Sequence, residues 1–115
     1  MKLLMHILRE NKKLNIDNTR ANDITILNKL DEECKEVIKA TKDYHKDKTL
    51  SNLKEIVRET FDLIQVCILI LWRCHRRAKT MGEDNLIQEI NIEHKDKLYS
   101  RDWIIETGIE IDVKE

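Results

Sequence analysis

The chain has 115 residues, the size of one domain, and contains no proline and two glycines. Helices tolerate both residue types poorly, so this scarcity predicts an all-α fold, with residues 1–115 forming a single helical domain. With 21 Lys and Arg residues against 22 Asp and Glu residues, the formal net charge is −1, so the basic excess of nucleic-acid-binding or anionic-membrane-binding proteins is absent. We expect neither partner.

The first segment, Met1 to about Lys13, has apolar residues at the spacing of a short amphipathic helix. Its apolar part is too short, and too soon charged, for a signal peptide. The odd number of cysteines without a C-x-x-C spacing favours reduced thiols in a cytoplasmic protein. The polar residues "NIDNTRAND" that follow predict a connector. The cysteines are Cys34, Cys67 and Cys74.

A second helix is expected from about Thr25 to Tyr44. One apolar stripe recurs there at steps of three and four residues, which is typical of a helix with one buried face. The short segment "HKDKTLSN" predicts a turn, with Thr49 or Ser51 capping the next helix. The stripe consists of Leu27, Leu30, Cys34, Val37, Thr41 and Tyr44.

A third helix should continue to about Met81, with Gly82 as its stop. Its second half, "FDLIQVCILILW", is apolar on almost every side, and such a helix must be surrounded. A chain of this length offers few helices to surround it, so we expect a homo-oligomer, either a dimer or a tetramer. The basic run "WRCHRRAK" that follows either complements the dipole at the helix end or faces a phosphate.

A fourth helix is expected from about Asn85 to Arg101, so that about four helices form a bundle. Beyond it, apolar residues alternate with polar ones from Ile105 to Val113, which is typical of a strand. Because an isolated strand is unstable, this short extended tail should pair with another element or another subunit.

Acidic residues are concentrated on the second and third helices. At 100° per residue, Glu33 should lie at one edge of the apolar stripe and Glu36 further round on that side, whereas Glu32 should point away. Glu59 and Asp62 form a second pair three residues apart on the third helix. A short turn makes the two helices an antiparallel hairpin, in which both pairs lie at similar depths and can face each other.

Four converging carboxylates would repel one another, and they would either raise one another's pKa or recruit a cation. All-oxygen ligands favour a hard cation such as Mg²⁺ or Mn²⁺. The alternative is a solvated acidic helix face that binds nothing. A di-iron bundle is disfavoured because none of the four histidines follows a glutamate by three residues. Two isolated glycines also rule out a phosphate-cradling glycine loop.

The sequence "EECKE" at Glu32–Glu36, followed after residues 37–58 by "ETFD" at Glu59–Asp62, resembles a known signature. It is similar to the E-E-x-x-E…E-x-x-D motif of the all-α nucleoside triphosphate pyrophosphohydrolases, the MazG-like group that includes dimeric dUTPases and phosphoribosyl-ATP pyrophosphatases. The resemblance extends from about Leu27 to Trp103. Its last part, "HKDKLYSRDW", resembles the K-L-x-x-R-G-W ending of small MazG-like proteins, with Asp102 in place of the glycine.

This resemblance implies a Mg²⁺-dependent hydrolase that converts a nucleoside triphosphate or deoxynucleoside triphosphate to the monophosphate and pyrophosphate. It implies that Glu33, Glu36, Glu59 and Asp62 bind the metal, and Glu33 or Glu36 would activate the attacking water. Lys97 and Arg101 would bind the triphosphate, although both also fit a solvated basic face. The alternative function is a non-catalytic helical oligomer that binds a nucleotide or a protein partner.

Overall fold

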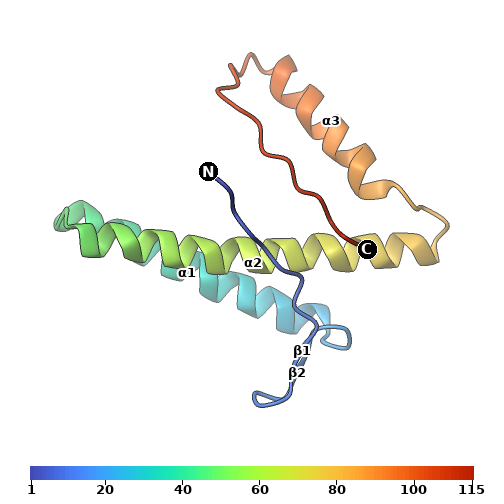
Figure 1. The fold of residues 1–115 in the computed structure, drawn as a ribbon, viewed down its shortest axis with the longest axis horizontal. Coiled ribbons are helices and arrows are strands. Elements are labelled where there is room, and N and C mark those ends of the chain that lie inside the picture. Colours follow the sequence, from blue (N-terminus) through green and yellow to red (C-terminus); the bar gives the residue numbers. More distant parts are fainter.

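The computed structural model describes residues 1–115 and is mostly helical (Figure 1). A two-stranded antiparallel hairpin, β1 (Glu10–Asn11) and β2 (Ile16–Asp17), precedes three helices. These are α1 (Asp23–Lys46), α2 (Leu50–Thr80) and α3 (Leu86–Ser100). Helices α1 and α2 pack as an antiparallel pair, whereas α3 diverges from the end of α2, and the C-terminal segment returns toward α2.

Both ends of the α1–α2 pair are defined by side-chain and backbone caps. The Asn22 side chain accepts a hydrogen bond from the Thr25 amide at 2.8 Å at the start of α1. The predicted cap Thr49 accepts one from the Asn52 amide at 3.1 Å at the start of α2. Gly82, with φ +81°, ends α2 as predicted, because the amides of residues 82 and 83 bond back to the carbonyls of residues 79 and 78.

The inner face of α1 is rotated relative to the predicted stripe. Leu27, expected inside, is 61% exposed, whereas Glu33, expected at the edge, is 5% exposed. The residues that face α2 recur with alternating steps of four and three, the spacing of a coiled-coil seam, and Glu33 occupies one of its positions. The α1 side of this seam consists of Ile26, Leu30, Glu33, Val37, Ala40 and Tyr44.

The matching seam of α2 follows the same spacing. It includes Asn52 and the carboxylate of Glu59 in its first half, and apolar residues followed by Arg73 in its second half. Ile26, Val66 and Leu69 form the buried core cluster, so the apolar core lies toward the C-terminal half of α2. The polar half of the seam lies between this core and the α1–α2 turn. The α2 seam consists of Asn52, Ile56, Glu59, Leu63, Val66, Ile70 and Arg73.

The predicted N-terminal helix is wrong, and the structure therefore contains three helices rather than four. Met1–Arg9 has no regular structure, and residues 10–17 form the hairpin. Short isolated helices are marginal in water, and here asparagines offer the backbone other partners. Asn15 occupies the left-handed region at φ 55°, and Asn18 donates its side-chain amide to the Leu8 carbonyl at 3.0 Å.

The predicted fourth helix is confirmed as α3, but the predicted strand in the tail is not formed. Residues 103–115 have no strand partner and are exposed throughout. The alternating pattern is present, yet no free strand edge lies beside it to supply the ladder of hydrogen bonds that a strand needs. The tail is held instead by side-chain contacts at Glu115.

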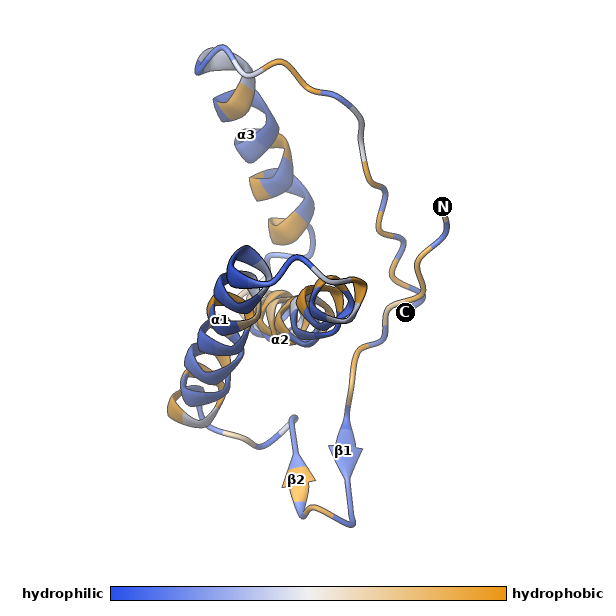
Figure 2. Cartoon of the chain, turned by 90° about the vertical axis from the view of Figure 1, so that its left-hand side faces the viewer, coloured by the Kyte–Doolittle hydropathy of each residue, from blue (hydrophilic) through white to orange (hydrophobic).

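The folded chain leaves much apolar surface uncovered. Only seven residues are buried, and the radius of gyration is 16.8 Å, whereas a compact chain of this length is expected to have about 13 Å. In Figure 2, α1 is predominantly hydrophilic, whereas hydrophobic residues are spread around α2. None of the three helices combines the length and the apolar character needed to cross a membrane.

Candidate metal centre

Three of the four predicted carboxylates converge where α1 and α2 face each other. Glu33 from α1 meets Glu59 and Asp62, which lie one turn apart on α2, and one oxygen from each lies within 4.8 Å of the others. Glu33 is buried, Glu59 is half-buried and Asp62 is exposed. The cluster therefore extends from the helix seam to the surface, so that a small ion from solvent can reach it.

Glu36 adjoins this cluster through Glu59. A hydrogen bond shared with Glu36, followed by burial and by a contact with Glu55, raises the pKa of Glu59 to about 7. Two ionised carboxylates have no hydrogen to share, so this contact is favourable only when a proton or a cation lies between them. Glu36 therefore lies beside Glu59 but is not one of the three residues whose carboxylate oxygens converge.

Glu33 and Glu59 each have one buried carboxylate oxygen without a hydrogen-bond partner. Oε1 of Glu33 lies 3.0 Å from the Lys29 ammonium, but Oε2 of Glu33 is buried without a hydrogen-bond donor. Oε2 of Glu59 is also buried and receives no hydrogen bond from any N–H group. A buried oxygen of this kind costs about 1–3 kcal/mol, and more when it is charged. A bound cation would supply the missing partner to both oxygens.

The side chain of Glu32 is exposed to solvent, whereas that of the adjacent Glu33 is buried. The Glu32 side chain is 56% exposed, and it contacts only the Lys29 ammonium, at 3.6 Å. Its outward direction agrees with the helical-wheel prediction. The consecutive residues Glu32 and Glu33 therefore provide a solvated carboxylate and a buried one in the same short segment.

Two neighbours of the site were not predicted to take part in it. Lys29 is the only cation paired with the buried Glu33, and this contact raises the pKa of Lys29. Glu55 contacts Glu59, but its own pKa is lowered, chiefly by its hydrogen bond with Arg58. Each lies four residues before the glutamate that it contacts, so helical spacing could have identified both.

The predicted phosphate-binding residues lie elsewhere in the protomer. Lys97 is in the last turn of α3, and Arg101 follows that helix as its C-cap. Helix α3 contacts α2 but not α1, and Figure 1 shows it leading away from the α1–α2 pair. Within one protomer, the structure does not bring these two cations to the acidic cluster.

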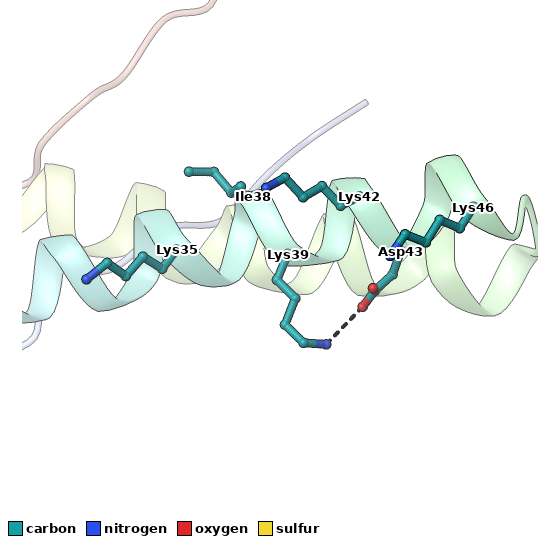
Figure 3. A pocket seen from close by; sticks show the side chains of 6 residues that line it. All are labelled: Lys35, Ile38, Lys39, Lys42, Asp43 and Lys46. Atoms are coloured by element: carbon teal, nitrogen blue, oxygen red, sulfur yellow. Dashed lines mark hydrogen bonds and ion pairs between the residues drawn. The ribbon is translucent and has the colours of Figure 1, made fainter.

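A second group of charges follows the outer face of α1. Four lysines line a shallow depression there, and Lys39 pairs with Asp43 at 2.9 Å (Figure 3). All of its lining residues belong to one helix, so no second element encloses a ligand. This face has the features of a solvated helix surface. The lysines are Lys35, Lys39, Lys42 and Lys46.

The acidic cluster consists of carboxylates that could hold a metal ion. It combines oxygen ligands from two helices, burial of part of the site, and access from solvent at Asp62. No family model, curated protein or solved structure matches the chain.

Proposed function

We propose that the protein is a Mg²⁺-dependent nucleoside triphosphate pyrophosphohydrolase, which converts a nucleoside or deoxynucleoside triphosphate to the monophosphate and pyrophosphate. One observation supports this most strongly. Carboxylates of Glu33, Glu59 and Asp62 from two helices converge, and buried oxygens of the first two lack partners. These are the residues at which the sequence resembles the MazG-like signature.

Glu33, Glu36, Glu59 and Asp62 would hold the cation, with Mn²⁺ as an alternative to Mg²⁺. When bound, the metal neutralises phosphate oxygens and lowers the pKa of a coordinated water. Glu59 can take part only after it loses its proton, and a nearby cation favours that ionisation. The raised pKa of Glu59 thus couples metal binding to release of a proton.

The two proposed catalytic glutamates are placed differently. Glu33 is buried, and one of its oxygens is engaged by Lys29. Glu36 is half-buried and has no lysine or arginine partner, so its carboxylate is better placed to orient and deprotonate a water that enters from solvent. We therefore assign the general base to Glu36 and the main anchoring role to Glu33.

Binding of the triphosphate by Lys97 and Arg101 requires a second protomer, because α3 does not contact α1 within one chain. A surface suited to assembly is present on α2. An apolar stripe opposite the α1-facing seam repeats at steps of four and three residues, and four of its members are at least 36% exposed. The stripe consists of Val57, Phe61, Ile64, Ile68 and Leu71.

We expect this α2 stripe to form the core of a homo-oligomer, a dimer or a tetramer. Light scattering at micromolar concentration should report more than one protomer per particle. Ile64→Glu, which places a charge in the stripe, should shift the protein toward monomer, whereas Glu93→Gln on exposed α3 should not. A monomeric parent protein would contradict this assembly and the placement of Lys97 and Arg101 near a partner's acids.

The decisive experiment is a screen of the common ribo- and deoxyribonucleoside triphosphates with Mg²⁺, read by pyrophosphate release and by chromatography of the nucleotide product. The expected products are a monophosphate and pyrophosphate. A diphosphate and orthophosphate would indicate another hydrolase class. Nucleotide binding without any product would favour the alternative, a non-catalytic helical oligomer.

A further inference from the structure

A basic cleft lies beside the C-terminal half of α2, away from the acidic cluster. Its volume is about 1010 Å³, which is at the upper end of the size of small-molecule sites, about 300–1,000 Å³. The N-terminal segment and the last residues of the tail complete its walls. One carboxylate, Glu115, lines it together with six cations, Arg9, Arg73, Arg76, Arg77, Lys79 and Lys114.

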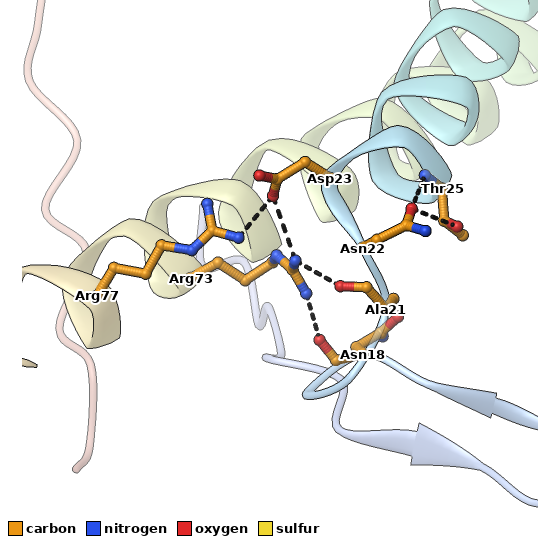
Figure 4. A network of polar contacts seen from close by, with 7 residues as sticks. All are labelled: Asn18, Ala21, Asn22, Asp23, Thr25, Arg73 and Arg77. Carbon is orange, nitrogen blue, oxygen red and sulfur yellow. Dashed lines mark hydrogen bonds and ion pairs between the residues drawn. The ribbon is translucent and has the colours of Figure 1, made fainter.

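Two of the cations hold the fold together. Figure 4 shows Arg73 donating to the carbonyls of Asn18 and Ala21, both at 2.6 Å, and both Arg73 and Arg77 reaching the Asp23 carboxylate. These contacts fasten the start of α1 to α2. The guanidinium groups of Arg73 and Arg77 are therefore committed to protein acceptors and shape the cleft.

Two further side chains of α2, His75 and Lys79, contact the Glu115 carboxylate. Its Oε1 lies 2.7 Å from Nε2 of His75, and its Oε2 lies 3.3 Å from the Lys79 ammonium. Lys79, the largest contributor, and His75 lower the pKa of Glu115, so the cleft favours an anion at this position. The neighbouring Arg76 is exposed and makes no ion pair or hydrogen bond.

His75 is the buried element of this arrangement. It is 9% exposed, and its ring packs against Trp72 with centroids 5.4 Å apart. Its Nε2 is buried and, despite its proximity to Glu115, lacks a partner with hydrogen-bond geometry. A different anion at this position could complete the bond that the Glu115 carboxylate leaves incomplete.

We infer that the cleft binds the phosphoryl group of a small phosphorylated ligand, which displaces the Glu115 carboxylate from His75 and Lys79. A phosphoryl group has three acceptor oxygens and a charge of about −1.5 to −2. It can therefore engage His75, Lys79 and the unpaired Arg76 together, whereas the Glu115 carboxylate has two oxygens and engages two groups.

The phosphoryl site is distinct from the metal centre. His75 lies 13 residues beyond Asp62 on α2, which corresponds to about 20 Å along a helix. Binding of phosphate at the cleft needs no divalent cation, since its partners are Lys79, Arg76 and the His75 ring. The test can therefore be run without metal. Its result does not depend on whether the protein has the proposed Mg²⁺-dependent hydrolase activity.

The experiment is a titration of the full chain with inorganic phosphate in metal-free buffer at constant ionic strength. In a Trp103→Phe background, Trp72 is the only tryptophan, and its fluorescence reports on the cleft. Glu115→Gln should tighten binding by about fivefold, because the carboxylate no longer competes for the site. Glu110→Gln makes the same charge change in the same exposed tail and should have no effect.

Arg76→Gln should weaken phosphate binding by about tenfold, whereas Lys95→Gln, a matched loss of one exposed charge on α3, should leave it unchanged. A nucleoside monophosphate should bind at least as tightly as inorganic phosphate. Equal behaviour of Glu115→Gln and Glu110→Gln, or of Arg76→Gln and Lys95→Gln, would overturn the inference. Binding to phosphatidic-acid vesicles without binding to either soluble ligand would overturn it as well.

Discussion

The acidic cluster and the basic cleft occupy two parts of the same helix, α2, but differ in how their charges are compensated. In the cluster, Lys29 pairs with Glu33 alone of the three converging carboxylates, and buried oxygens of Glu33 and Glu59 remain without donors. In the cleft, cations are matched by Asp23, by two backbone carbonyls and by Glu115. The chain thus supplies an anion to its basic site but supplies little positive charge to its acidic one.

The largest effect that would test this comparison is on turnover. Glu36→Gln or Glu59→Gln should lower pyrophosphate release at least about 100-fold, because each removes a proposed metal ligand and the first also removes the proposed base. Steady-state assays with the best triphosphate from the screen provide the measurement. Glu32→Gln, at the solvated neighbour of Glu33, should leave the rate within about twofold.

Comparison of Glu32→Gln with Glu36→Gln distinguishes a metal site from a solvated acidic helix surface. Glu32 and Glu36 lie on the same helix and carry the same charge, but only Glu36 contacts the cluster. If a solvated face were all that the acids provide, both substitutions would have the same small effect. Identical rates for Glu32→Gln and Glu36→Gln would therefore refute the metal centre.

The next effect is on thermal stability. A cation that binds only the folded protein stabilises it by about 2.7 kcal/mol at about 100 times its dissociation constant. For a chain of this size we expect Mg²⁺ or Mn²⁺ to raise the Tm by about 10 °C, and Na⁺ at matched ionic strength to do much less. Differential scanning calorimetry gives the measurement. Glu59→Gln should reduce the shift, and a full shift in that variant would contradict its role as a ligand.

A smaller effect concerns pH in the absence of metal. The pKa of Glu59 is about 7 in the folded protein and 4.5 ordinarily, so the folded state holds this proton more tightly. The stability that the proton contributes is fully present below about pH 4.5, decreases as the pH rises, and is lost above about pH 7. Urea unfolding across this range should show the free energy of unfolding falling with pH.

Glu59→Gln carries no titrating group at this position and should remove that decrease, whereas Glu32→Gln should retain it. Carboxylates with lowered pKa values, such as Asp23 and Glu115, lose stabilising contacts at more acidic pH and so do not produce the same trend. If the parent and Glu59→Gln have parallel pH profiles, Glu59 is not the group that holds the proton.

The helices were predictable because their signals are local. The boundaries of α1, α2 and α3 follow from apolar spacing and from the residues that begin or end helices, such as Thr49 before α2 and Gly82 after it. The N-terminal hairpin was missed because its apolar residues mimic a helix, whereas its asparagine turns decide the conformation. The tail pattern predicted a strand, but a strand needs a neighbour that local sequence does not reveal.

Three of the four predicted acids converge in the structure, but the burial of Glu33 was not predicted. Helical spacing grouped the four acids, yet it placed Glu33 at the edge of the stripe, because an apolar scale ranks Leu27 as the better core residue. The packing of α2 buries Glu33 instead. The basic cleft was beyond local reasoning, since Glu115 contacts a histidine 40 positions earlier in the chain (115 − 75).

The short connection between α1 and α2 has a consequence for the order of folding. Thr49, which caps α2, follows Asp47 by only two residues. The Asn52 side chain donates a hydrogen bond to the Asp47 carbonyl at 2.8 Å. Closing such a small loop costs little entropy, and contacts near a turn form early. The α1–α2 hairpin should therefore assemble before α3 docks, so that Glu33, Glu59 and Asp62 are brought together early in folding.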